Sequence, residues 1–370
     1  MTDLFKMADI FIDKIKKDYA EDVAIAAYYG SYAQGTQNSK SDLDIFFIPS
    51  TDRGGELGDC FILDDIGIDL FPISWTRAEG IASFNESIVS VLADCNILYY
   101  RSEEDLARFN SLRENIKSLC SPEKKPVMMN KAIEKFNKCF VSLYNIERLN
   151  DITSIRVEAF NIVTTVFETL SLLNQTYFKK GWGKNLSQIL SFKIKPNNIG
   201  ELVKSIITEE NNERIIENCT TLIDEMRNII LQEQKSVVKK YPFKDAFTGY
   251  YEEMKSTFNK IITACDNNDY ETAFYSSVAL QNEIASFLAM VEEGCSYSRL
   301  NTFSEFRKVY DKYNLVDLLE HFQYDDLSIL KKAVVLLEAI FVDVLKSNNV
   351  EIKEFSTLDE YENYMNATFK

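Results

Sequence analysis

The sequence predicts an α+β protein, with a mixed β-sheet and flanking helices first and an all-α helical-bundle region after it. Up to about residue 118, short runs rich in β-branched and aromatic residues alternate with helical stretches. After residue 126, apolar residues recur every three or four positions, as on the buried face of a helix. The 370 residues include only 12 Gly and 6 Pro, and this scarcity of turn formers favours a largely helical chain.

The first predicted domain, residues 1–118, begins with an amphipathic helix over residues 3–19. A buried apolar run then stops at Gly30, and a second one ends at Pro49 before a glycine-bearing loop. Asp64 and Asp65 form the predicted turn between the next two strands. The predicted strands are 23–29, 43–48, 60–63, 66–73 and 96–100, and the second predicted helix is 75–92.

The remainder of the chain reads as two helical regions. Residues 126–240 form the predicted helical bundle domain and residues 241–370 a second helical region, with a break at Tyr241-Pro242-Phe243. Apolar stripes of this kind are typical of a core rather than of a ligand-binding surface. Residues 351–370 are expected to be either a short amphipathic tail or partly disordered.

Composition and charge limit the partners. Lys and Arg number 41 against 57 Asp and Glu, so the net charge is −16. Such a surface repels phosphate backbones and anionic membranes, and it favours a small cationic molecule over a long nucleic acid. The N-terminus lacks a basic region followed by an apolar stretch, no apolar run could cross a bilayer, and the seven cysteines include no C-x-x-C pair. We therefore expect a cytoplasmic protein.

The lone histidine also limits the chemistry. His321 has no Ser or Cys nucleophile motif near it and is expected to be structural or on the surface. A histidine-rich metal site or a catalytic triad would need partner residues that are not present around it. Carboxylates must therefore carry out most of any catalysis.

One stretch carries that chemistry, the segment between the first two predicted strands. Asp42 and Asp44 open the second strand, and because side chains alternate along a strand, both should project to the same side. Two such carboxylates repel each other unless a cation lies between them. Oxygen ligands without nearby His or Cys favour Mg²⁺, which also retains waters and substrate phosphates.

The Gly-Ser step before this pair supplies the complementary part. Gly30 lets the backbone turn sharply and approach a ligand, and Ser31 is expected to cap the short helix that follows. A triphosphate on this turn would place its metal at the two aspartates, an arrangement suited to phosphoryl or nucleotidyl transfer. Asp69, flanked by Ile68 and Leu70, is the preferred third carboxylate; Asp64 and Asp65 compete but lie in a solvated turn.

This pattern resembles the nucleotidyltransferase superfamily that includes DNA polymerase β, whose signature is an apolar strand, Gly-Ser, about ten residues, and Asp-x-Asp. Gly30-Ser31-Tyr32-Ala33-Gln34-Gly35 and Ser41-Asp42-Leu43-Asp44 look most like the bacterial enzymes that adenylylate aminoglycosides or lincosamides, which pair this domain with a helical one. The resemblance implies that Asp42, Asp44 and Asp69 are catalytic metal ligands. It also implies that Gly30, Ser31 and Ser41 bind the nucleotide.

The expected function is therefore Mg²⁺-dependent transfer of a nucleoside monophosphate, AMP from ATP, to a hydroxyl of a small cationic acceptor of the aminoglycoside type. Asp69 would help to deprotonate that hydroxyl, and an additional base from the helical region is left open among Glu134, Glu147 and Glu158. The alternative is a protein-directed nucleotidyltransferase or an antitoxin-like regulatory partner. A polymerase acting on RNA ends is disfavoured because the helical region shows no basic stripe. Formation of a homo-oligomer stays open.

Overall fold

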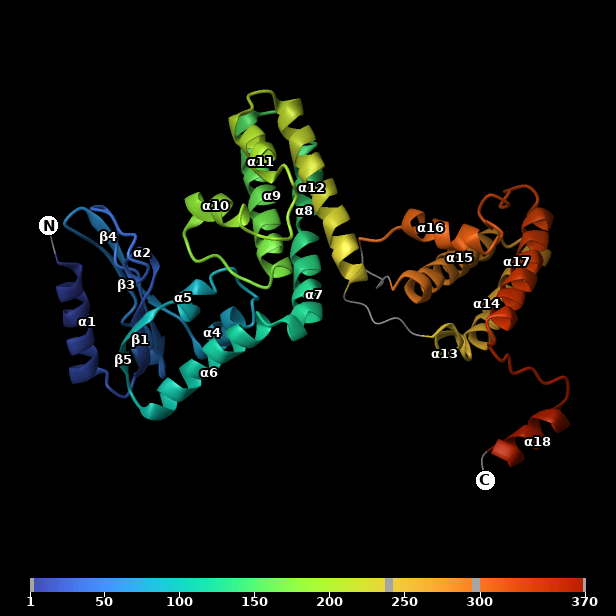
Figure 1. The fold of residues 1–370 in the computed structure, drawn as a ribbon, viewed down its shortest axis with the longest axis horizontal. Coiled ribbons are helices and arrows are strands. Elements are labelled where there is room, and N and C mark those ends of the chain that lie inside the picture. Colours follow the sequence, from blue (N-terminus) through green and yellow to red (C-terminus); the bar gives the residue numbers. More distant parts are fainter. Residues whose placement is uncertain (1–2, 237–241, 295–299, 369–370) are drawn as a thin grey trace. The chain divides into compact units, whose positions relative to one another are not determined.

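The computed structural model describes residues 3–236, 242–294 and 300–368. The chain divides into two compact units, Met1–Ile230 and Leu231–Lys370 (Figure 1). The first unit contains a mixed sheet followed by helices, which confirms the predicted α+β class. The predicted break at residue 241 lies outside the described residues. In the described part of the chain, we find no helix that is long and apolar enough to cross a membrane.

The sheet has five strands in the order β3-β4-β2-β1-β5, and only β2 and β4 pair in parallel. The two central strands are apolar and almost entirely buried, because helices cover both of their faces. The strands are β1 (Val23–Tyr28), β2 (Ile45–Pro49), β3 (Asp59–Leu63), β4 (Ile66–Pro72) and β5 (Asn96–Tyr100).

Two helices cover the opposite faces of this sheet. The apolar side of α1 (Leu4–Asp18) packs on one face, where Phe11 lies with its ring centroid 5.6 Å from that of Phe47. The neighbouring Phe46 points to the other face and contacts Phe109 of α6 (Glu103–Leu119), at 6.2 Å between centroids. The adjacent residues Phe46 and Phe47 thus point to opposite faces of the sheet and contact the helices on its two sides, α6 and α1.

The predicted helix over residues 75–92 is wrong as a single element. The structure has α4 (Trp75–Ala82) and α5 (Ser90–Ala93), separated by a turn in which Phe84 has a φ of 60°. A left-handed backbone at this residue cannot continue a right-handed helix, so the chain turns there. This turn directs the residues around Ser87 toward the cavity described below.

The helical part of the first unit is centred on α9 (Ile152–Leu173), a long helix that is buried along much of its length. It packs against α7 (Lys125–Phe136) and α8 (Cys139–Ile146). The other helices of this part are the short α10 (Asn185–Ile189), α11 (Ile199–Thr208) and α12 (Asn212–Lys235), which continues into the second unit. The short helical turns elsewhere are α2 (Gly30–Ala33), α3 (Asp52–Gly55), η1 (Pro122–Lys124) and η2 (Trp182–Lys184).

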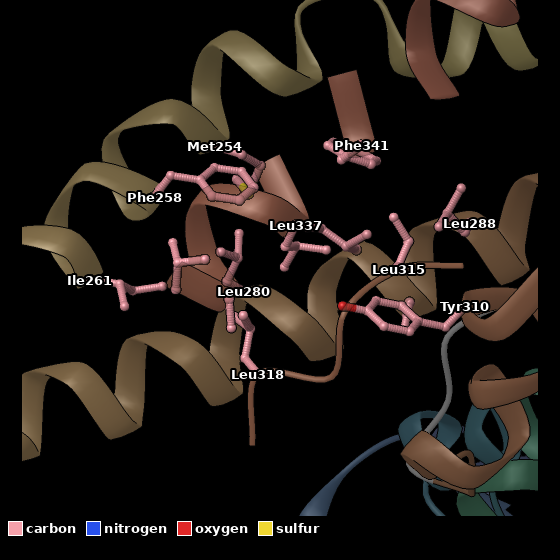
Figure 2. Close-up of a cluster of buried hydrophobic side chains, with 14 of the residues drawn as sticks. Met254, Phe258, Ile261, Leu280, Leu288, Tyr310, Leu315, Leu318, Leu337 and Phe341 are labelled. Carbon is pink, nitrogen blue, oxygen red and sulfur yellow. The ribbon is translucent and has the colours of Figure 1, made fainter. Parts of the chain in front are cut away.

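The second unit has its own apolar core, shown in Figure 2. Phe258, Leu280 and Leu337 come from three different helices and are all fully buried. Tyr310 is also buried, and its hydroxyl donates a hydrogen bond to the carbonyl oxygen of Val316 at 2.8 Å. The helices are α13 (Phe243–Phe247), α14 (Tyr250–Asp266), α15 (Tyr270–Glu293), α16 (Phe303–Lys312), α17 (Leu327–Ser347) and α18 (Leu358–Thr368).

Candidate active site

The site lies where β1 ends and β2 begins, and the two chain segments approach each other closely there. The amide of Tyr29 donates to the carbonyl oxygen of Asp44 at 3.0 Å, so the end of β1 is tied to the start of β2. Gly30 follows with a φ of +71°, and a Cβ on it would lie 2.0 Å from Oδ2 of Asp44. Only glycine fits here, because both the left-handed backbone and the neighbouring carboxylate exclude a side chain.

Asp42 and Asp44 lie immediately before β2 rather than inside it, since that strand begins at Ile45. Asp42 is exposed, Leu43 is buried and Asp44 is partly buried, so the alternation of a strand already holds here. Burial raises the pKa of Asp44 to about 6, with a further contribution from the negative charge of Asp42 and a smaller one from Asp69. The charged form of Asp44 is therefore disfavoured unless a cation offsets its surroundings.

Asp69 belongs to the same electrostatic neighbourhood but not to the same cavity. In the parallel β2–β4 pair, Ile45 lies opposite Leu70, which places Asp69 beside Asp44. Asp69 is exposed, accepts a hydrogen bond from Sγ of Cys60 at 3.3 Å, and lines a separate shallow groove with that residue. Its charge still acts on Tyr29, whose pKa is raised to about 12 by burial first and then by Asp44, Asp69 and Asp42.

A cavity of about 700 Å³ opens beside the aspartate pair, entirely within the first unit. Its volume falls in the range of about 300–1,000 Å³ that small-ligand pockets occupy. The residues predicted to bind nucleotide and metal that line it are Gly30, Ser31, Ser41, Asp42 and Asp44. The structure thus brings five of the six predicted site residues to one cavity and leaves Asp69 just outside its lining.

The expected role of Ser31 as a helix cap is wrong. Helix α2 begins at Gly30, its N-cap position is Tyr29, and no side chain caps it. Ser31 is instead the second residue of the helix and lines the cavity. Because Gly30 already occupies the first position of the helix, Ser31 lies one residue beyond the first and two beyond the position from which a side chain could cap it.

A lysine-rich loop between α9 and α10 forms another part of the lining. Lys179, Lys180 and Lys184 all reach the cavity from this loop. Two amide side chains hold it in place: Nε2 of Gln34 donates to the carbonyl oxygen of Lys179, and Oε1 of Gln188 accepts from the amide of Lys179 at 3.0 Å. Because Gln34 directly follows α2, this contact ties the loop to the Gly-Ser turn.

This loop was not among the site residues predicted from the sequence. The available signal was its composition, since three lysines and two glycines occur within six residues in the connection after α9. The segment is Lys179-Lys180-Gly181-Trp182-Gly183-Lys184. Flexible glycines and clustered cations in that pattern are suited to an anionic ligand.

The acid that the helical part contributes to the cavity is Glu168, together with Thr164 one turn earlier on α9. The candidates Glu134, Glu147 and Glu158 are not in the described lining. Glu168 forms an ion pair with Lys135 at 2.8 Å, with side chains only 28% and 20% exposed. Its position in the mostly buried C-terminal half of α9, between Phe167 and Leu170, was the signal that could have singled it out.

The donor set of the cavity suits a magnesium ion held jointly with a substrate. In the described part of the chain, no group of three or more His, Cys, Asp or Glu side chains is arranged to hold a metal on its own. Mg²⁺ usually binds through one or two carboxylates, with phosphate oxygens and waters completing its octahedron. Asp42 and Asp44, with the raised pKa of Asp44, fit that description.

Comparison with known proteins agrees with the resemblance in the sequence. Residues 106–236 match the family described as the KNTase C-terminal domain. A solved structure of a nucleotidyltransferase-like protein from Exiguobacterium sibiricum 255-15 also matches, with 11% identity, a TM-score of 0.33, and coverage of 67% of this chain and 87% of that one. None of the curated proteins matches. The family match covers α6 to α12, the helical part of the first unit, rather than the sheet.

Proposed function

We propose that this chain is a nucleotidyltransferase that transfers AMP from ATP to a hydroxyl group of a small acceptor in a Mg²⁺-dependent reaction. The observation that carries the proposal is one cavity of about 700 Å³ lined by Asp42, Asp44 and three lysines. A triphosphate and its metal need these two kinds of charge side by side, acids for the metal and cations for the phosphate tail. The family match of the helical part supports the same class of transfer.

Asp42 and Asp44 would hold the metal, which when bound neutralises charge that develops on the phosphates. Their mutual repulsion and the burial of Asp44 disfavour two ionised carboxylates here, and a bound cation would offset both effects. Gly30 lets the backbone of the turn pass directly against the Asp44 carboxylate, so the turn and the proposed metal site lie side by side.

The lysine loop would hold the β- and γ-phosphates, which leave together as pyrophosphate. Lys179, Lys180 and Lys184 would offset the negative charge that accumulates on this leaving group. Gln34 connects the loop to the turn at Gly30, so the two sides of the phosphate site are positioned together.

The acceptor hydroxyl must lose a proton during the transfer. Glu168 lines the cavity, and its ion pair with Lys135 fixes the orientation of the carboxylate. Asp69 lies outside the lining, next to Asp44, and would act through its charge on the metal site. We therefore assign the proton-accepting role to Glu168 ahead of Asp69.

The test is a search for transfer products. The full chain is incubated with ATP, Mg²⁺ and a panel of aminoglycosides and lincosamides, and each acceptor is examined by mass spectrometry for addition of AMP. Lys184→Gln should weaken ATP binding about tenfold, because a charge-assisted contact contributes about 1.5–3 kcal/mol. The matched control is Lys193→Gln, an exposed lysine in the connection between α10 and α11 that is absent from the described lining. Metal-independent ATP binding would contradict the proposal.

A protein acceptor is the second candidate, and α18 is the observation that favours it. This C-terminal helix has no buried residue in the structure, and it exposes Leu358, Tyr361 and Met365. An apolar face at this spacing could dock a partner protein. ATP binding with no product from any small acceptor would favour this candidate.

A further inference from the structure

The charges around the cavity bear on which acceptor it takes. Of the described residues that line it, the acidic ones are Asp42, Asp44 and Glu168, and the basic ones are Lys179, Lys180 and Lys184. The lining is thus balanced, unlike the protein as a whole, which has a net charge of −16. The acidity of the whole chain is therefore no guide to the charge of this site.

Under the proposed function, two of the three acids, Asp42 and Asp44, bind the metal. Only Glu168 would remain to attract a cationic acceptor, and its Oε2 lies 2.8 Å from Nζ of Lys135. The two side chains are 28% and 20% exposed, so their attraction is screened less than that of a surface pair. Lys135 also lines a small cavity next to the main one, where both it and Glu168 are present.

The rest of the wall near Glu168 is neutral. The residues around α5 contribute two serine hydroxyls and two aliphatic side chains, and α9 contributes Thr164. The hydroxyl of Thr164 donates to the carbonyl oxygen of Phe160 at 2.8 Å and can still accept a hydrogen bond from a ligand. The members from around α5 are Ser87, Ile88, Ser90 and Val91.

We propose that the acceptor is an uncharged, hydroxyl-bearing molecule, and that Lys135 sets this preference by offsetting the charge of Glu168. This inference rests on the proposed function, and it replaces the expectation of a cationic acceptor. Hydroxyls of the acceptor would bond with the serines, Thr164 and the Glu168 carboxylate, while Ile88 and Val91 contact its carbon skeleton. A polyamine would meet no further carboxylate in the described lining.

The experiment measures charge preference with a matched pair of ligands. Kanamycin serves as the polycationic probe, and its fully N-acetylated form keeps the hydroxyls and has no positive charge. Each is titrated calorimetrically into the full chain with Mg²⁺ and a non-hydrolysable ATP analogue. We expect the wild type to bind kanamycin no more tightly than the acetylated form. A tenfold preference of the wild type for kanamycin would overturn the proposal.

Substitution of Lys135 gives the sharper test. Lys135→Gln should tighten kanamycin binding about tenfold, because Glu168 is then free to pair with the ligand, and should leave the acetylated form unchanged. Lys131→Gln is the control, since Lys131 is one turn away on α7 and donates to Oδ1 of Asn85 at 2.9 Å. If the Lys135→Gln protein shows the same preference between the two ligands as the wild type, the assigned role of Lys135 is refuted. The same conclusion follows if neither ligand binds the wild type and neither binds this variant.

A second variant covers the case in which Lys135→Gln fails to fold. Glu168→Gln leaves the charge of Lys135 without its partner and should weaken binding of kanamycin more than binding of the acetylated form, whose hydroxyls can still donate to the remaining amide oxygen. An unchanged preference in this variant would also overturn the proposal. Failure of the proposed function gives a different result, since the ATP analogue, titrated on its own into the full chain with Mg²⁺, would then not bind.

Discussion

Replacing Asp44 by Asn should stabilise the metal-free protein while abolishing catalysis. The carboxylate of Asp44 is partly buried next to Gly30, and both its burial and the charges of Asp42 and Asp69 raise its pKa from 3.8 to about 6. Ionisation at pH 7 therefore costs the native state free energy that it does not cost the unfolded chain. Asn has the same shape without the charge, and the backbone bond from Tyr29 to the Asp44 carbonyl is unaffected.

The size of the effect follows from the same shift. At about 1.4 kcal/mol for each tenfold change in acidity, the difference between the two pKa values corresponds to roughly 3 kcal/mol. Because the group is only partly buried, screening by solvent reduces this to about 1–2 kcal/mol. A native pKa above the unfolded one means that this group's contribution to stability falls as the pH rises from about 4 to about 6, and is constant above that.

Tryptophan fluorescence in a denaturant titration is the appropriate assay. Both tryptophans, Trp75 and Trp182, lie in the first unit, so the signal reports the part of the chain that contains Asp44. The Asp44→Asn protein should be more stable than the wild type at pH 7 and equal to it near pH 4. The control is Asp13→Asn, an exposed acid on α1. Equal or lower stability of the Asp44→Asn protein at pH 7 would refute the reasoning.

Other substitutions test the site and the second unit. Gly30→Ala should lower the free energy of unfolding in a denaturant titration by about 3 kcal/mol or more, since its Cβ would lie 2.0 Å from Asp44. Gly35→Ala is the comparison, with a φ of +66° and open space around it, and should lower it by about 1–2 kcal/mol. Similar costs at the two glycines would contradict the close approach. Asp42→Asn should leave stability nearly unchanged and remove the thermal stabilisation by Mg²⁺ with ATP; a retained shift would mean that Asp42 does not bind the metal. Phe341→Ala should lower the free energy of unfolding by about 3–5 kcal/mol by circular dichroism, against about 0.5 kcal/mol or less for the exposed Val335→Ala on the same helix. A small loss at Phe341 would place it outside the core.

Local sequence patterns were sufficient for the sheet and for the aspartate pair. Buried strands need apolar residues on both faces, so the runs at β1 and β2 were legible without any tertiary information. The spacing from Gly30 to Asp44 is set by the short connection between these two strands. Hydrophobic periodicity and turn-forming residues describe local features of this kind.

The parts that the sequence did not reveal depend on tertiary structure. Lys179 reaches the cavity through Gln34, a residue 145 positions earlier in the chain. Glu168 lies in the mostly buried C-terminal half of α9, and its place at the cavity becomes visible only when α9 is positioned beside the aspartates. The turn at Phe84 divides a helical pattern because tertiary packing overrides the apolar spacing there.

The most direct test of nucleotide transfer at this site is a calorimetric titration of the full chain with ATP, performed once with Mg²⁺ and once with EDTA. The account predicts saturable binding with Mg²⁺, little or none with EDTA, and loss of the Mg²⁺-dependent part in the Asp42→Asn protein. Equal affinity under both conditions, or no binding under either, would show that Asp42 and Asp44 do not bind a nucleotide through a metal.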